Sequence, residues 1–312
     1  MLSYSRRRAL SIVGAAALAP SIAGAQVKTP LKVCTTIGDS FSEPFYAADN
    51  GMFSKAGFDV DVLIENNAGA AVAAVSGGAA DVGLGDFVGL ANAVGHGIPL
   101  VLIAGGGRYV STAAPTLLCV AKNSTIQHPK DLEGTTVAVV TLVGFGTVAL
   151  KAWLAQNGVD LAKVKLVELT FAAMGPALTR GTISAGVIGE PLLSQERDDV
   201  RPIGRPYDAI SKDFLLNAWF TTRDWLAKNP DTARRLVRVV YDTARWANAH
   251  QDQSLPILAK YLKLDTDRLT GMVRAPFSTT LDAAKIQPVI EAGLKYQVIT
   301  QPLDVTSIIA KV

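Results

Sequence analysis

Two short stretches of the sequence place a carboxylate at the end of the same small-residue pattern. "SGGAADVGLGD" spans residues 76–86 and "RGTISAGVIGEP" spans residues 180–191, so that Asp86 ends one apolar run and Glu190 ends the other. We expect the two acids to face one ligand from opposite sides of a shared site. The alternative for each acid is that it caps the helix that follows. Both roles stay open for Asp86, whereas Pro191 suits a first helical turn and favours a ligand contact for Glu190.

Other candidate residues lie where strand-like runs pass into turns. The amide groups of "VGFGT" (143–147) could bind an anionic or carbonyl oxygen at a helix N-terminus, or form only a tight turn. Arg108 in "GGGRY" could pair with an anion or be solvated, and Trp219 could stack on a planar ligand or belong to the core. The full set of candidate ligand-binding residues is Ser40, Phe41, Glu43, Asp86, Phe87, Arg108, Gly144, Phe145, Gly146, Thr147, Glu190, Asn217 and Trp219.

Metal chemistry and serine hydrolysis are disfavoured by where the histidines stand. "GDS" before Phe41 resembles the opening block of GDS hydrolases, but such an enzyme needs Asp-x-x-His, and none of the three histidines has an Asp three residues before it. The histidines are scattered, and Cys34 and Cys119 are 85 positions apart, so we expect neither a metal nor a cofactor. Both cysteines lie in apolar runs, which predicts two buried free thiols rather than a disulfide.

One alternative hypothesis, that the protein is an enzyme, stays open. Residues 144–149 form G-x-G-x-x-A at a strand-to-helix turn, and Glu168 ends the next strand, which matches the spacing of a dinucleotide fingerprint. An exported nicotinamide-dependent oxidoreductase is therefore the alternative to a non-enzyme. About 110 residues of α/β pattern precede this unit, which argues against it.

The elements that must position these residues alternate between strand-like and helix-like runs, which predicts an α/β fold. One cycle of such runs fills residues 31–105 and a second begins near Pro115, so the pattern of the two carboxylates is part of an internal repeat. After a further strand near Phe214 the sequence is mostly helical. The chain has 312 residues and is 49% hydrophobic, enough for two cores.

The first 25 residues resemble an export signal. Arg6, Arg7 and Arg8 precede an apolar segment, and "AGA" at 23–25 fits a cleavage site. The arginines resemble a twin-arginine signal, and an ordinary secretory signal is the alternative. The remaining chain has equal numbers of acidic and basic residues, which disfavours nucleic acid as a partner. We expect a protein that is soluble and periplasmic after cleavage.

The order of several segments resembles the solute-binding proteins of ABC importers, in the nitrate, taurine, alkanesulfonate and thiamine-precursor group. The segments are "EPFYAADNGMFSKAGFDVDV", "SGGAADVGLGD", "IQHPKDLEGTTVAV", "GEP" and "WLAKNPDTARRLVRVVYDTARWA". The resemblance implies a two-lobed periplasmic-binding fold of type II, each lobe a mainly parallel sheet flanked by helices. It implies a monomer without catalysis that captures a small solute and delivers it to a membrane permease with its ATPase.

The repeat and the resemblance together predict how the chain is divided. We expect lobe one to comprise 26–116 plus 218–312 and lobe two 117–217, with crossings near Leu117–Ala121 and Leu215–Trp219 and closure on binding. The resemblance leaves sulfonate, nitrate, carboxylate, amine and pyrimidine-like ligands open. Candidate acids in the cleft outnumber candidate bases, which favours a cationic or nitrogen-heterocyclic ligand.

Overall fold

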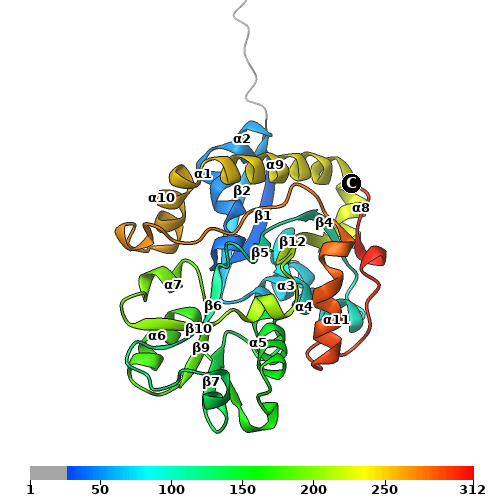
Figure 1. The fold of residues 1–312 in the computed structure, drawn as a ribbon. Helices are drawn as coiled ribbons and strands as arrows, with labels where there is room; N and C mark the ends of the chain where they lie inside the picture. The colour runs from blue at the N-terminus through cyan, green and yellow to red at the C-terminus, as the bar shows by residue number, and fades with distance from the viewer. Residues whose placement is uncertain (1–26) are drawn as a thin grey trace, which may run out of the picture.

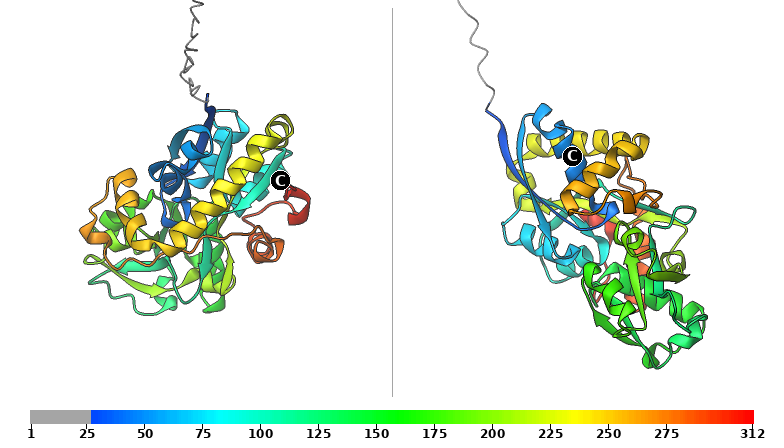
Figure 2. Two further views of the ribbon diagram at one scale, coloured as in Figure 1. Left: turned by 90° about the horizontal axis from the view of Figure 1, so that it is seen from above. Right: turned by 90° about the vertical axis from the view of Figure 1, so that its left-hand side faces the viewer.

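The chain forms two lobes, each built on one five-stranded sheet. The computed structural model describes residues 27–312, so the expected export signal at 1–25 lies outside the described residues. Figure 1 shows the two lobes one above the other, and the right-hand view of Figure 2 shows the narrow connection between them. We call the half built on the first sheet lobe one and the other half lobe two.

The sheet of lobe one has the order β2-β1-β3-β12-β4. Strand β1 is parallel to both neighbours, whereas β12, which returns from lobe two, is antiparallel to β3 and β4. Four strands therefore run one way and the returning strand runs against them. The strands are β1 (Thr29–Thr36), β2 (Phe58–Glu65), β3 (Val82–Asp86), β4 (Leu100–Gly105) and β12 (Asn217–Thr222).

The sheet of lobe two repeats this plan. Its order is β10-β6-β9-β7-β8, with β7 parallel to β8 and β9, and β6 antiparallel to β9 and β10. Here too the strand that comes from the other lobe, β6, is the antiparallel one. The strands are β6 (Thr116–Ala121), β7 (Thr136–Val139), β8 (Lys165–Glu168), β9 (Ala185–Gly189) and β10 (Val200–Gly204). The predicted two-lobed periplasmic-binding fold is confirmed, and β3 and β9 hold equivalent central positions.

The two connections between the lobes pair with each other. Strand β5 (Arg108–Val110) leaves lobe one, and β11 (Asp213–Leu215) returns to it, as an antiparallel two-stranded ribbon. The first connection therefore precedes the expected crossing at Leu117–Ala121, which belongs to β6 inside the second sheet. The apolar run of Leu117–Ala121 is typical of a buried strand, and the sequence pattern could not distinguish such a strand from a connection between the lobes.

Helices cover both faces of each sheet because successive strand residues point to opposite sides. In lobe one, Cys34 and Phe220 face a core that includes α3 and α4, whereas Val33 and Trp219 face a core that includes α9. In lobe two, Leu118 packs toward one face and Cys119 toward the other. The larger helices are α1 (Glu43–Asp49), α3 (Ala68–Ser76), α4 (Phe87–Gly95), α5 (Phe145–Gln156), α6 (Phe171–Thr179), α9 (Pro230–Ala249), α10 (Gln251–Leu262) and α11 (Gln287–Lys295).

The glycines of β3 make room for neighbouring side chains. A Cβ atom at Gly83 or Gly85 would lie 2.9 Å from the ring of Phe220 on β12. Both glycines therefore serve packing within lobe one. They are small because a phenylalanine from the antiparallel strand and valines of α3 pack directly on them.

Both cysteines are buried free thiols, as predicted. Cys34 and Cys119 lie in the two different sheets, and burial raises the pKa of each thiol to about 12, so both stay protonated. Within residues 27–312, no helix is long and apolar enough to cross a membrane.

Candidate ligand-binding site

A cavity lies between the two sheets and is lined by both lobes. About 730 Å³ of free space lies within it when the solvent at its open mouth is counted. Its walls combine aromatic, aliphatic and small polar side chains. The lining residues are Thr36, Ile37, Ser40, Phe41, Asn67, Ala68, Asp86, Thr116, Val140, Thr141, Phe145, Gly146, Phe171, Val187, Tyr207 and Leu216.

The carboxyl ends of parallel strands supply most of this lining. Ile37 follows β1, Asn67 follows β2 and Asp86 ends β3 in lobe one, while Thr141 follows β7 and Phe171 follows β8 in lobe two. Open α/β sheets bind ligands at these ends, because the loops there are free to carry polar groups. The two equivalent sheets therefore present equivalent edges to one cavity.

Four helices begin at the cavity, and their N-termini differ between the lobes. In lobe one, Asn67 Oδ1 accepts from Ala70 N at 2.9 Å, and Asp86 Oδ1 accepts from Val88 N and Gly89 N at 2.8 and 2.9 Å. In lobe two, neither Gly144 before α5 nor Thr170 before α6 makes a side-chain capping bond. The α5 and α6 N-termini therefore keep amide groups for an oxygen acceptor of a ligand.

Asp86 supplies the acidic group of the cavity. It is 8% exposed, and burial raises the pKa of its carboxyl, while the amides of Gly89 and Val88 oppose the shift. Among the lining residues that the structure describes, no lysine or arginine accompanies it. Burial also raises the pKa of Tyr207, with the charge of Asp86 adding to the shift, so the hydroxyl is a neutral donor.

Aromatic rings form the end of the cavity beside the ribbon of β5 and β11. The rings of Phe145 and Tyr207 meet edge to face, with their centroids 4.6 Å apart, and Phe214 packs on Phe145 at 5.3 Å. Edge-to-face packing fixes the ring orientations. With Phe41 and Phe171 also in the lining, the cavity offers several ring faces and edges to a planar ligand.

Five of the predicted site residues line the cavity: Ser40, Phe41, Asp86, Phe145 and Gly146. The first two belong to the turn after β1 and the last two to the start of α5. Asp86 also caps α4, so the two roles left open for it coexist geometrically.

Asn217 does not line the cavity but holds the turn that does. Its Nδ2 donates to Ser40 O at 3.0 Å and its Oδ1 accepts from Gly107 N at 2.7 Å. Gly107 is required here, because a Cβ atom would lie 2.5 Å from the Cβ atom of Ser40. Asn217 therefore positions Ser40 through its backbone oxygen, without lining the cavity itself.

Glu43, Trp219 and Phe87 belong to the core of lobe one instead of the cavity. Trp219 Nε1 donates to Glu43 Oε2 at 2.8 Å, and both residues are fully buried. Phe87 packs among the helices on the other face of the sheet. The sequence did not indicate that these three side chains point into the core.

Arg108, Thr147 and Gly144 are also occupied within the protein. Arg108 Nε donates to Asp213 Oδ1 at 2.6 Å and so joins β5 to β11. Thr147 Oγ1 donates to Thr141 O at 2.7 Å. A Cβ atom at Gly144 would lie 2.5 Å from Thr141 Cγ2, so this glycine allows its own loop to close.

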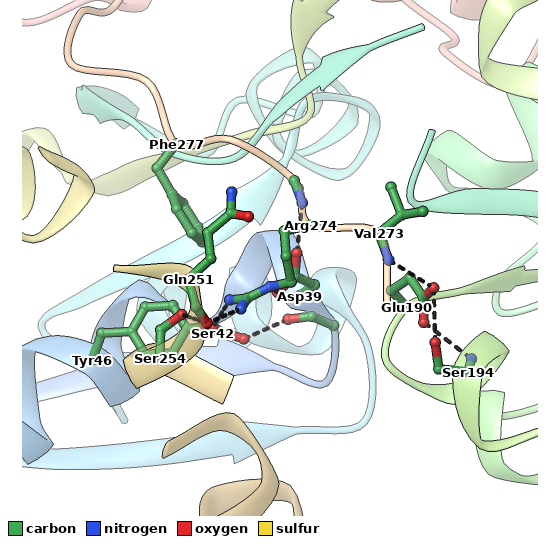
Figure 3. Close-up of polar contacts among 12 residues, drawn as sticks. Asp39, Ser42, Tyr46, Glu190, Ser194, Gln251, Ser254, Val273, Arg274 and Phe277 are labelled. Atoms are coloured by element: carbon green, nitrogen blue, oxygen red, sulfur yellow. Dashed lines mark hydrogen bonds and ion pairs between the residues drawn. The ribbon is translucent and has the colours of Figure 1, made fainter. Parts of the chain in front are cut away.

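Glu190 lies at the contact between the lobes and not in the cavity. Its Oε2 accepts from Ser194 N and its Oε1 from Ser194 Oγ, both at 3.0 Å, while Val273 N of lobe one donates to Oε1 at 3.3 Å (Figure 3). Burial raises the pKa of its carboxyl, opposed by the bonds from Ser194 and Val273. Of the two acids that we expected to face one ligand, Asp86 lines the cavity and Glu190 does not.

The G-x-G-x-x-A turn does form the predicted strand–turn–helix, but its acid is engaged elsewhere. Glu168 Oε1 accepts from Leu142 N at 2.6 Å and from Thr141 Oγ1 at 3.1 Å. In a dinucleotide site this carboxylate would instead bind a ribose hydroxyl. The geometry therefore does not favour the oxidoreductase alternative.

Several lining residues were missed from the sequence. Asn67 and Phe171 follow strands β2 and β8 and begin helices, so the rule that identified Asp86 would also have found them. Tyr207 and Leu216 lie beside the ribbon between the lobes, and no local pattern marks them. Between residues 27 and 312, no group of three or more His, Cys, Asp or Glu side chains could hold a metal ion.

Comparisons with known proteins agree with this architecture. Residues 40–254 match the family model described as NMT1/THI5 like. A protein of Brucella abortus (strain 2308) named "Putative binding protein BAB2_1146" is 24% identical over 229 residues, which cover 72% of this chain and 68% of the relative.

Two solved structures show the same fold at low sequence identity. The periplasmic aliphatic sulphonate binding protein SsuA from Escherichia coli superposes with a TM-score of 0.75 at 18% identity, over 90% of this chain and 92% of that one. The desulfurization enzyme DSZB gives a TM-score of 0.70 at 16% identity, over 91% of this chain and 96% of that one. The fold therefore occurs in binding proteins and in an enzyme, and by its sequence this chain belongs to the NMT1/THI5-like family.

Proposed function

We propose that the protein is the periplasmic solute-binding component of an ABC importer. It captures a small solute between lobe one and lobe two and delivers it to a membrane permease and its ATPase. The observation that carries the proposal is the cavity between two equivalent sheets, to which both lobes contribute strand ends and helix N-termini.

Binding is favoured over catalysis by the chemistry of the lining. Ser40 is the one serine of the described lining, and the lining set contains no histidine, cysteine or lysine that could activate it. His96 and His250 are bonded through Nδ1 to backbone oxygens of their own helices. The proposal therefore assigns no reaction to the cavity, although the fold is shared with an enzyme.

The lining also favours one class of solute. An anion such as a sulfonate, nitrate or carboxylate would meet the Asp86 carboxylate with no lysine or arginine from the described lining to offset the repulsion. A planar amine or pyrimidine-like ring would donate N–H groups to Asp86 and stack against Phe41 or Phe171. An oxygen or ring nitrogen at its other end would accept from the amides at the start of α5.

Thermal-shift measurements on the mature protein test this proposal. A ligand that binds only the folded state raises the melting temperature. We expect aminopyrimidines or related cyclic amines to raise it, and alkanesulfonates, nitrate and carboxylates to leave it unchanged. Stabilisation by alkanesulfonates alone would overturn the assigned solute class, and no response to any member of the panel would count against solute capture.

A further inference from the structure

Segment 263–277, which follows α10, crosses from lobe one to the rim of lobe two. We call it the strap. Gln195 Nε2 of lobe two donates to Asp265 O at 2.9 Å, and Arg197 donates to Thr270 O at 3.2 Å. In the opposite direction, Arg268 donates to Gln195 O at 2.9 Å. The strap therefore exchanges hydrogen bonds with lobe two on the rim of the cleft.

The strap is anchored in lobe one by a buried ion pair. Arg274 Nε donates to Asp39 Oδ1 at 2.9 Å, Ala275 N donates to Asp39 Oδ2 at 2.6 Å, and Arg274 also donates to Tyr46 Oη at 2.7 Å (Figure 3). The side chains of Arg274 and Asp39 are 7% and 1% exposed. Asp39 directly precedes Ser40 of the cavity, so one ion pair fixes the strap to the turn that lines the cavity.

Glu190 of lobe two bonds to both parts of this anchored unit. Its backbone oxygen accepts from Asp39 N at 3.0 Å, and its Oε1 accepts from Val273 N at 3.3 Å. Ser194 holds the carboxylate in place from within lobe two. These bonds exist only while the lobes are together, because Asp39 and Val273 belong to one lobe and Glu190 to the other.

We propose that Glu190 and the strap form a latch that holds the two lobes closed and sets how fast a captured solute is released. The latch rests on the proposed function, in which the lobes close over a solute. Glu190 has a positioning role in it, because its side chain does not line the cavity. Its contribution is the same for every solute. Losing it therefore raises all dissociation rates by one factor and leaves the preference between solutes unchanged.

The distance between the lobes of the ligand-free protein tests the latch without knowledge of the solute. Spin labels at Lys55→Cys in lobe one and Lys165→Cys in lobe two lie on exposed residues, and both native cysteines are buried. Double electron–electron resonance then reports the closed and open populations. We expect Glu190→Gln to lower the closed population at least threefold, because glutamine has one acceptor oxygen instead of two and cannot accept from Ser194 N and Val273 N at both positions.

Two further variants make the result decisive. Glu133→Gln removes a half-buried carboxylate that bonds only within lobe two in the described contacts, and should leave the distances unchanged. Arg197→Ala combined with Arg268→Ala removes two exposed strap contacts and should shift the population as Glu190→Gln does, even if that variant fails to fold. The latch would be overturned if Glu190→Gln and the double arginine variant both gave the same distance distribution as the wild type, whether that distribution is open or closed. Solute capture would then still be judged by the thermal shifts.

Discussion

Asp86 and Glu190 stand at equivalent places in the two lobes and do different things. Asp86 is the last residue of β3 and Glu190 directly follows β9, and both are fully buried five-residue strands at the centre of their sheets. Asp86 precedes the nine-residue helix α4, caps it and lines the cavity. Glu190 precedes the four-residue helix α7 (Leu192–Gln195) and bonds to Ser194 and across to lobe one. The repeated strand therefore sets the position of the acid in each lobe, whereas the residues that follow it determine which groups the carboxylate contacts.

Removal of Arg274 is expected to give the largest loss of stability. Its buried ion pair with Asp39 anchors the strap that contacts Glu190. Arg274→Met leaves a buried carboxylate without its cation, which typically destabilises a protein by about 3–5 kcal/mol. Urea denaturation measures this change. The control is Arg108→Met, whose ion pair with Asp213 is 39% and 32% exposed and should contribute at most about 1 kcal/mol. Equal losses in the two variants would show that the Asp39 pair is no more than a surface contact.

Glu43 supplies another buried carboxyl, one that contacts neither the cavity nor lobe two. Burial raises its pKa to about 8, with the bond from Trp219 opposing the shift. Because the folded state then binds more protons than the unfolded state, stability falls as the pH rises from about 4.5 to about 8, by up to roughly 1.4 kcal/mol per pH unit.

Glu43→Gln is expected to abolish this part of the pH dependence, because glutamine keeps an acceptor for Trp219 Nε1 and does not ionise. Urea denaturation at several pH values measures the slope. An unchanged slope would mean that Glu43 is ionised in the folded protein or that other carboxyl groups dominate.

Asp86→Asn tests whether the charge of Asp86 contributes to solute binding in the cavity. Asparagine keeps an oxygen for the amides of Val88 and Gly89 but removes the charge. We expect the affinity for a cationic or N–H-donating solute to fall about tenfold or more, with a melting temperature within a few degrees of the wild type. Asp282→Asn, which changes a capping residue on the exposed surface, serves as control. Calorimetry that finds undiminished affinity would remove Asp86 from the binding site.

Asn67→Ala is expected to give the smallest effect. It removes the capping bond of α3 at Ala70, worth about 0.5–2 kcal/mol of stability. Thr222→Ala removes the equivalent capping bond of helix α8 (Arg223–Lys228), away from the cavity, and should destabilise the protein by a similar amount. If Asn67→Ala lowers solute affinity severalfold while Thr222→Ala does not, Asn67 binds the solute as well as the helix.

The sequence predicted the fold well because periodicity and the repeat are properties of whole segments. Alternating strands and helices required two covered sheets, and the positions of Ser40, Asp86 and Phe145 at strand ends followed from that topology. The directions of side chains were much harder to predict. Trp219 turns into the core because Glu43 accepts its N–H, and Arg108 faces Asp213, which is 105 residues away in the sequence.

The missed features share a physical cause. Tyr207 enters the cavity from the connection between the lobes, and the strap reaches Glu190 from 83 residues away. Both depend on contacts between segments far apart in the chain, and such contacts leave no local pattern. A buried carboxylate with an arginine partner, such as Asp39 with Arg274, is likewise visible only once the chain is folded.

Hydrogen–deuterium exchange with and without a stabilising solute shows whether the solute lies between the two sheets. We expect slower exchange in both lobes at the cavity segments, residues 36–41 and 67–70 in lobe one and 143–147 and 171–173 in lobe two. Residues 121–126 and 178–184, which line a surface groove of lobe two, should exchange as before. Protection confined to one lobe, or centred on that groove, would contradict a solute held between the two sheets.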